Sequence, residues 1–182
     1  MVRRLAAFAS VALVAAGLVA GCGYTRKSLL ADNIKNIYVA PVKNTIDLSA
    51  EVTEKKGFRV YRPGIEVDLT NAIINRYIFD GNLKVSPSEK ADAVVQARLV
   101  DYRRDALRYS NSDDVVEYRL SVVLDVTVYE TRDHKILWSD RSLTGESSFF
   151  LSGPRATSED EAAGKAVEDA ARRVVDNTIE IW

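Results

Sequence analysis

The strongest pattern in the chain is a strict alternation of apolar and mixed positions between Val116 and Val128. Alternation with a period of two indicates a strand that buries one face. This run is longer than the five or six residues of a typical strand. The sequence therefore predicts a long strand whose second face meets water or a polar partner. That second face carries Glu117, Arg119, Asp125 and Thr127.

Weaker patterns predict the strands that accompany it. A β-rich run over Ile34–Val42 should stop near Pro41, because proline cannot continue a hydrogen-bonded ladder. Further strands are expected at Leu83–Val85, at Ala93–Val100 and, after a hairpin turn at Thr131–Lys135, at Ile136–Glu146. The polar stretch Lys43–Arg62 is expected to be a loop.

Two segments have helical spacing. Ile65, Leu69, Ile73 and Tyr77 recur on one face, and the Asp-Gly-Asn sequence after Phe79 should end this first helix. The second helix is expected over Glu159–Ile181. It has a capping box made by Ser158 and Glu161. Its apolar stripe consists of Ala163, Ala166, Val167, Ala170, Val174 and Ile181.

The order of these elements predicts an α+β fold. We expect a mostly antiparallel, four-stranded sheet with two helices packed on one of its faces. The chain contains no internal repeat and no second apolar run of membrane length, so residues 34–182 are expected to form one domain.

The first residues have the pattern of a secretory signal peptide. Arg3 and Arg4 precede an apolar run over Leu5–Val19, which ends at Ala20, Gly21 and Cys22. About 15 apolar residues are too few for a membrane-spanning helix. The sequence Leu18-Val19-Ala20-Gly21-Cys22 resembles the lipobox of bacterial lipoproteins, in which cleavage precedes the cysteine and the cysteine is lipidated.

This resemblance divides the chain into three parts. Residues 1–21 would be removed, Cys22 would carry the covalent lipid, and residues 22–33 would form a tether to the folded domain. Because Gly23 takes the place of the aspartate that often retains lipoproteins at the inner membrane, it favours the outer membrane of a host with two membranes. A multiply acylated Cys22 would hold the protein to the membrane almost permanently.

Composition excludes several classes of function. The mature chain, Cys22–Trp182, keeps 23 of the 25 basic residues and all 26 acidic ones, so it has no basic excess that would favour nucleic acid. The single histidine, His134, falls in a predicted turn, and no zinc motif, phosphate loop or nucleophile elbow is present. We therefore predict a protein that is not an enzyme and needs neither a metal nor a cofactor apart from the lipid on Cys22.

Two polar connections have two interpretations each. The segment Asp101–Tyr109 contains three arginines, whose planar guanidinium groups suit phosphates and carboxylates. It could equally be part of a long twisted hairpin with a solvated tip. The segment Ser147–Arg155 places Phe149, Phe150 and Leu151 in a row, either folded back on the core or docked on a protein or lipid partner.

The order of these features resembles the LptE family of lipopolysaccharide-assembly lipoproteins. The resemblance rests on Gly21-Cys22-Gly23-Tyr24, the strand at Ile34–Val42, the helix Gly64–Phe79, the strand opening Val116-Glu117-Tyr118-Arg119-Leu120, and the stretch Leu143–Phe150 before the last helix. The segment Arg62–Ile73 looks like the divergent, non-enteric branch of this family.

The resemblance implies a function without catalysis. LptE proteins act at the outer membrane, on its periplasmic side, as a plug and assembly factor of the LptD β-barrel, and they contact lipopolysaccharide. By position, Arg108 is the best match to the family's lipid-contacting basic residues, and Arg103, Arg104 and Arg155 are neighbouring candidates.

An alternative hypothesis starts from the same elements. A CsgG-like secretion lipoprotein or a lipoprotein activator of a peptidoglycan synthase also places a strand and a helix before an Ala-Asp-Ala-Val run, as at Ala91–Val94. A pore-forming protein of the first kind should also carry amphipathic strands for a membrane barrel, and the sequence shows none.

Overall fold

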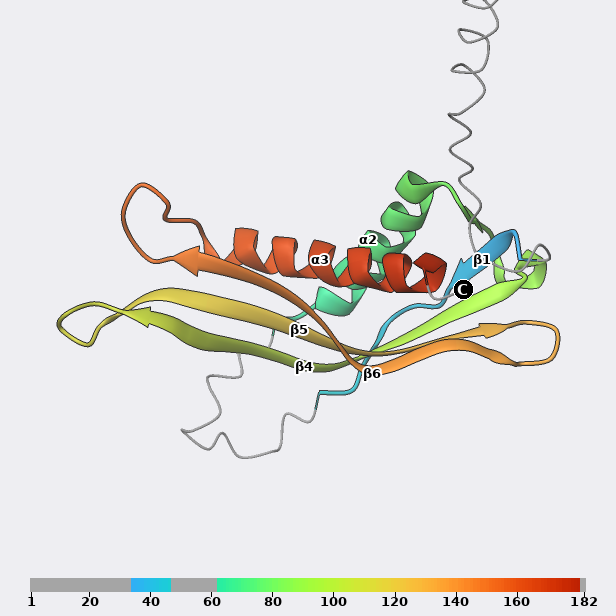
Figure 1. The fold of residues 1–182 in the computed structure, drawn as a ribbon, viewed down its shortest axis with the longest axis horizontal. Coiled ribbons are helices and arrows are strands. Elements are labelled where there is room, and N and C mark those ends of the chain that lie inside the picture. Colours follow the sequence, from blue (N-terminus) through green and yellow to red (C-terminus); the bar gives the residue numbers. More distant parts are fainter. Residues whose placement is uncertain (1–33, 47–61, 181–182) are drawn as a thin grey trace, which may run out of the picture.

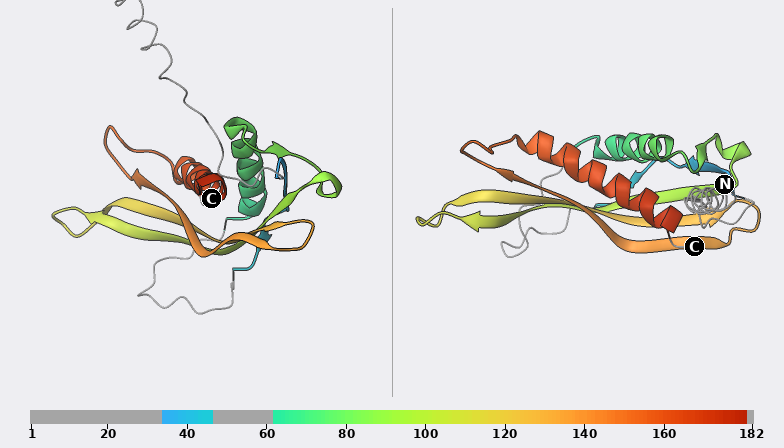
Figure 2. Two further views of the ribbon diagram at one scale, coloured as in Figure 1. Left: turned by 45° about the vertical axis from the view of Figure 1, so that its right-hand side comes forward. Right: turned by 45° about the horizontal axis from the view of Figure 1, so that its top comes forward.

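A long, twisted sheet covered on one face by two helices forms the body of the protein (Figure 1). The computed structural model describes residues 34–46 and 62–180. The predicted signal peptide, Cys22 and the tether lie outside the described residues, as do Ile181 and Trp182. The α+β class and the placement of both helices on one face agree with the sequence prediction (Figure 2).

Within the described residues, the sheet has six strands in a mixed arrangement. They are β1 (Asn36–Val39), β2 (Lys43–Asn44), β3 (Lys84–Val85), β4 (Ala93–Tyr109), β5 (Val115–Glu130) and β6 (Ile136–Phe150). Their order is β3-β1-β4-β5-β6, and β2 also pairs with β4. The three long strands are antiparallel, whereas β1 is parallel to both β3 and β4, and β2 is parallel to β4.

The predicted four-stranded sheet is therefore wrong in strand number, and the sheet is mixed, because its short strands are parallel while its long strands are antiparallel as predicted. Helix α2 (Ile65–Asp80) lies between β1 and β3 along the chain. A helical crossover returns the chain in the same direction, which makes the neighbouring strands parallel. Strand β2 was missed because its two residues lie in a polar stretch that has no alternating pattern.

The long hairpin extends further than the sequence pattern indicated. β4 continues through Asp101–Tyr109, so this segment is part of the twisted hairpin rather than a separate loop. β6 continues to Phe150, which places residues 147–150 in a strand. The ladder passes irregularities between Leu99 and Asp101 and between Ala106 and Arg108, where a simple alternation in the sequence is lost.

The end of α2 and the start of α3 agree with the sequence prediction, whereas the predicted end of the second helix at Ile181 lies outside the described residues. Gly81 follows α2 with φ of 76°, and its N–H donates to the carbonyl oxygen of Tyr77 at 3.0 Å. This left-handed conformation suits glycine. Helix α3 (Glu159–Glu180) begins after Ser158, whose hydroxyl oxygen accepts the N–H of Glu161 at 3.1 Å.

The core lies between the sheet and the two helices. Leu120, Val122, Leu124 and Val126 of β5 are fully buried there. α3 faces them with alanine and valine side chains and crosses β6 at Gly145, where an added Cβ would lie 2.4 Å from the backbone of Ala166 and Ala170. A buried hydrogen bond of 2.9 Å from the Tyr77 hydroxyl to Thr178 joins α2 to α3.

The two ends of this body differ. At one end, here called the proximal end, lie β1, β3, the last turn of α2 and the turn Thr131–Lys135 (Figure 1). At the other end, the distal tip, the β4–β5 turn and the connection from β6 to α3 extend beyond the helices. The distal tip comprises residues 104–118 and 147–158.

Candidate functional site at the distal tip

Arginine and aromatic side chains gather at the distal tip. The strand register places Ala106 opposite Tyr118, and Tyr118 opposite Phe149, on the side of the helices. The same register places Arg108 opposite Glu117, and Glu117 opposite Phe150, on the other side. The rings of Tyr118 and Phe149 stack with centroids 5.8 Å apart.

Arg104 ties the hairpin to the start of α3. Its guanidinium carbon lies 4.7 Å from the centroid of the Tyr118 ring. One of its terminal nitrogens donates to the carboxylate of Glu159 at 2.7 Å. Both partners are partly buried, so this arginine has a structural role that the sequence did not reveal.

Phe150 has two arginines over its ring. The guanidinium carbon of Arg155 lies 4.6 Å from the ring centroid, and that of Arg108 lies 5.7 Å from it. Cations within about 6 Å of an aromatic face are attracted by the ring quadrupole. Phe150 therefore brings together two arginines that are 47 positions apart in the sequence.

The four candidate arginines differ in how their charge is compensated. Arg108 lies 3.4 Å from the carboxylate of Glu117, whose side chain is only 11% exposed and also accepts a hydrogen bond from Ser148. Arg103 lies on the opposite side of β4 from Arg104 and pairs with Asp101 and Asp105 at 3.2 and 3.1 Å.

Arg155 is the exception. Among the residues that the structure describes, it has no acidic partner within ion-pair distance. The sequence analysis placed Arg108 first for lipid contact, whereas the structure leaves Arg155 with the uncompensated charge. Sequence position alone could not show this, because Glu117 and Glu159 pair with Arg108 and Arg104 across strands and helix.

A compact loop holds Arg155 in place. Gly153 has φ of 88°, in the left-handed region that favours glycine. The N–H of Ala156 donates to the carbonyl of Gly153 at 3.0 Å, and that of Thr157 to the carbonyl of Phe150 at 3.3 Å. These bonds fold the loop back on the end of β6.

Apolar side chains accompany the cations. Leu107, Tyr109 and Leu151 are 42%, 57% and 52% exposed. Phe149 is buried and Phe150 half-buried, so the predicted row of three apolar residues is only partly exposed. The tip thus combines exposed apolar groups with guanidinium groups, which suits an amphipathic anion.

The sheet face without helices is polar and internally paired. Arg98 binds Asp125 at 2.7 Å, and Arg119 lies 3.9 Å from Glu146. The predicted polar face is therefore present, but most of its charge is neutralised within the sheet.

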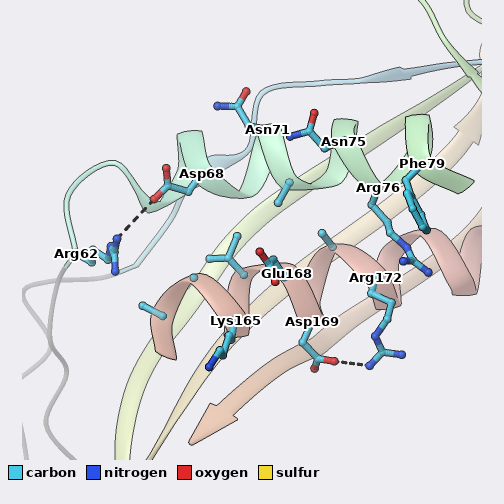
Figure 3. Close-up of a pocket in the computed structure, with 15 residues that line it drawn as sticks. Arg62, Asp68, Asn71, Asn75, Arg76, Phe79, Lys165, Glu168, Asp169 and Arg172 are labelled. Carbon is cyan, nitrogen blue, oxygen red and sulfur yellow. Dashed lines mark hydrogen bonds and ion pairs between the residues drawn. The ribbon is translucent and has the colours of Figure 1, made fainter. Parts of the chain in front are cut away.

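A groove lies between α2 and α3, with a volume of about 900 Å³ (Figure 3). Arg62 and Arg76 line it and pair with Asp160 and Asp176. Asp169 has a lowered pKa: burial acts to raise it, but hydrogen bonds from Arg172, from the N–H of Glu146 and from Arg173 outweigh burial. This groove holds no histidine or cysteine among its lining residues.

Other features of the described residues are not site-like. His134 is exposed in the turn Thr131–Lys135, as predicted. Within residues 34–46 and 62–180, no three His, Cys, Asp or Glu side chains are grouped to hold a metal ion. No helix in these two ranges is long and apolar enough to cross a membrane.

Comparison with protein families decides the relationship. The family model for LptE, described as lipopolysaccharide-assembly, matches residues 34–178. The chain belongs to the LptE family. This match covers the sheet, α2 and all but the last two residues of α3, and it favours the LptE hypothesis over the alternative secretion or activator lipoproteins. LptE is a family of assembly lipoproteins, which is consistent with a function without catalysis.

Comparisons with curated proteins and solved structures give less information than the family match. No curated protein matches this LptE-family chain. A hypothetical protein from Chlamydia trachomatis has a TM-score of 0.49 and 14% identity, over 80% of this chain and 98% of its own. A minor lipoprotein from Acinetobacter baumannii has a TM-score of 0.48 and 14% identity, over 81% and 94%. Rare lipoprotein B from Shewanella oneidensis has a TM-score of 0.42 and 12% identity, over 79% and 92%.

Proposed function

We propose that this protein is an outer-membrane lipoprotein, anchored through Cys22 on the periplasmic side, that acts as plug and assembly factor of an LptD-type β-barrel. The observation that carries the proposal is the LptE family match over residues 34–178. The lipobox-like sequence ending at Cys22 supplies the anchor.

The shape and polarity of the domain suit this role. The lumen of a large membrane barrel is polar. The sheet face without helices presents paired charges such as Arg98 with Asp125 and Arg119 with Glu146. Paired charges of this kind contact water or a polar wall without leaving a net charge buried.

The distal tip is the proposed contact for lipopolysaccharide. The phosphates of lipopolysaccharide would meet Arg155 and Arg108 beside Phe150, with Arg104 nearby. The acyl chains of lipopolysaccharide would meet Leu107, Tyr109 and Leu151. Arg155 should contribute most, because its charge is not already compensated by a described acid. Arg103 should contribute least, because it lies on the opposite side of β4 from Arg104 and has two acidic partners.

The test is an affinity purification of the tagged, lipidated protein from detergent-solubilised envelopes. We expect a near-stoichiometric LptD-type barrel among the partners identified by mass spectrometry. The Cys22→Ala variant is the control, since it should fractionate as a soluble or inner-membrane form. Recovery of a peptidoglycan synthase, or of the protein alone, would refute the proposal.

A further inference from the structure

The most exposed large apolar side chains of the described residues lie at the proximal end. Phe79 is 81% exposed and Ile78 is 63% exposed, both in the last turn of α2. Ile136, which is 61% exposed, begins β6 at the same end. Single exposed apolar residues are normal, but a group of the three most exposed ones, separate from the exposed group at the distal tip, indicates a second contact surface.

These side chains are not needed for the core. The buried face of α2 consists of Ile65, Leu69, Ile73 and Tyr77. Ile78 and Phe79 lie outside it, and Phe79 lies at one end of the groove with Arg76, whose guanidinium carbon is 5.6 Å from the ring centroid (Figure 3). A helix that only had to cover the sheet would carry polar residues at these two positions.

Two exposed lysines lie at the same end, one in β3 and one just before β1. β3 follows α2 after Gly81–Leu83, and Lys84 in β3 is adjacent to Lys35, whose carbonyl accepts the Lys84 N–H at 2.9 Å. Both lysine side chains are exposed, and neither has an ion-pair partner within the described ranges. Exposed apolar side chains and lysines at the same end of a molecule are typical of surfaces that lie in the headgroup region of a membrane.

The position of the lipid anchor indicates that the partner of this surface is the membrane. Ile34, the first described residue, follows Cys22 by twelve positions, and a chain of that length spans at most about 40 Å. Ile34 leads directly into β1, so the anchor reaches the proximal end first. The distal tip lies farther along the sheet by the length of β4, which has 17 residues and a rise of about 55 Å.

We propose that Ile78 and Phe79 insert into the headgroup region of the membrane beside the acyl anchor, while Lys35 and Lys84 contact lipid phosphates there. This proposal rests on the lipid anchor of the proposed function. It orients the domain, because the proximal end then lies at the leaflet that carries the anchor and the distal tip lies at the far end of the sheet from that leaflet.

Photocrosslinking of the lipidated full chain tests the occupant. Benzoylphenylalanine replaces Phe79 in one variant and Val67, which is 56% exposed near the start of α2, in a matched one. Both are tested in vesicles of phosphatidylethanolamine and phosphatidylglycerol and in isolated envelopes. We expect a phospholipid adduct at position 79 and none at position 67. No lipid adduct at 79, equal adducts at both positions, or a protein adduct at 79 in envelopes would overturn the proposal.

A second measurement uses the apolar pair directly. Lipidated protein with Ile78→Ser and Phe79→Ser should transfer between vesicles about tenfold faster, because less apolar surface is buried in the membrane. Val67→Ser is the control, since Val67 is a 56% exposed residue at the other end of α2. Equal transfer rates of the double variant and the control would overturn the proposal. Barrel co-purification is measured separately, so failure of the plug function is distinguishable from failure of membrane contact.

Discussion

The middle of the sheet and the distal tip are built from the same three strands but are stabilised differently. In the middle, Leu124 and Val126 are fully buried beneath the small side chains of α3. At the tip, contacts such as Arg104 with Glu159 at the start of α3 and Arg155 with Phe150 add to the single buried ring of Phe149. Exposed ion pairs and cation–π contacts contribute about 1 kcal/mol or less each. Stability therefore resides in the middle, and the tip is available for recognition.

The largest effect should come from a charge placed in the middle. Leu124→Asp should prevent folding at 25 °C, since an unpaired carboxylate in the core costs more than about 4 kcal/mol. Leu107→Asp at the tip should change the free energy of unfolding by about 0.5 kcal/mol or less. Urea denaturation followed by circular dichroism compares the two. Equal losses of stability would contradict the conclusion that stability resides in the middle of the sheet and not at the distal tip.

Glycine substitutions give the next largest contrast: Gly145 lies where β6 crosses α3, whereas Gly164 is exposed on α3 in the groove toward α2. Gly145→Ala should cost about 3 kcal/mol, because the new Cβ meets the α3 backbone at 2.4 Å. Gly164→Ala should stabilise α3 by up to about 1 kcal/mol, because nothing lies within 4 Å of its added Cβ. The midpoints of urea unfolding measure both. A tolerated Gly145→Ala would show that α3 packs less closely on β6.

A smaller effect should appear as a pH dependence of the middle region. The pKa of Asp169 is lowered in the folded state, so the folded state favours its carboxylate. The resulting stability is present above the unfolded pKa of about 4 and is lost as pH falls through the lower folded pKa. Asp169→Asn should therefore show a flatter fall in unfolding free energy between about pH 5 and pH 2. An unchanged pH profile would remove Asp169 as a contributor.

The smallest effect on stability is expected at the tip, together with the clearest effect on function. Arg155→Gln should leave the unfolding free energy within about 0.5 kcal/mol and weaken lipopolysaccharide binding about tenfold, because a charge-assisted contact to phosphate is lost. Arg103→Gln is the matched control, because Arg103 lies on the side of β4 opposite Arg104 and is paired with two acidic residues. Binding to purified lipopolysaccharide measured by fluorescence checks the difference. Equal losses from both variants would argue for a general charge effect.

Local patterns predicted most of the elements. The alternation over Val116–Val128 correctly located β5. The Ser158–Glu161 cap correctly placed the start of α3, and the Asp-Gly-Asn sequence correctly placed the end of α2. The four-stranded count was wrong and the short parallel strands were missed, because their direction depends on a crossover whose packing no local pattern records. The extension of β4 through Asp101–Tyr109 was undecided, because charged side chains obscure an alternation that passes two irregularities.

The candidate site shows the same limit at the level of single residues. The sequence by itself determined which arginines are available near the strand ends, the lipobox-like segment ending at Cys22, and the apolar faces of both helices. Only the tertiary structure decided that Glu117 and Glu159 compensate Arg108 and Arg104, whereas Phe150 holds Arg155 beside Arg108. The physical reason is that charge compensation depends on distances across strands and between sheet and helix, which are fixed by register and packing rather than by neighbours in the chain.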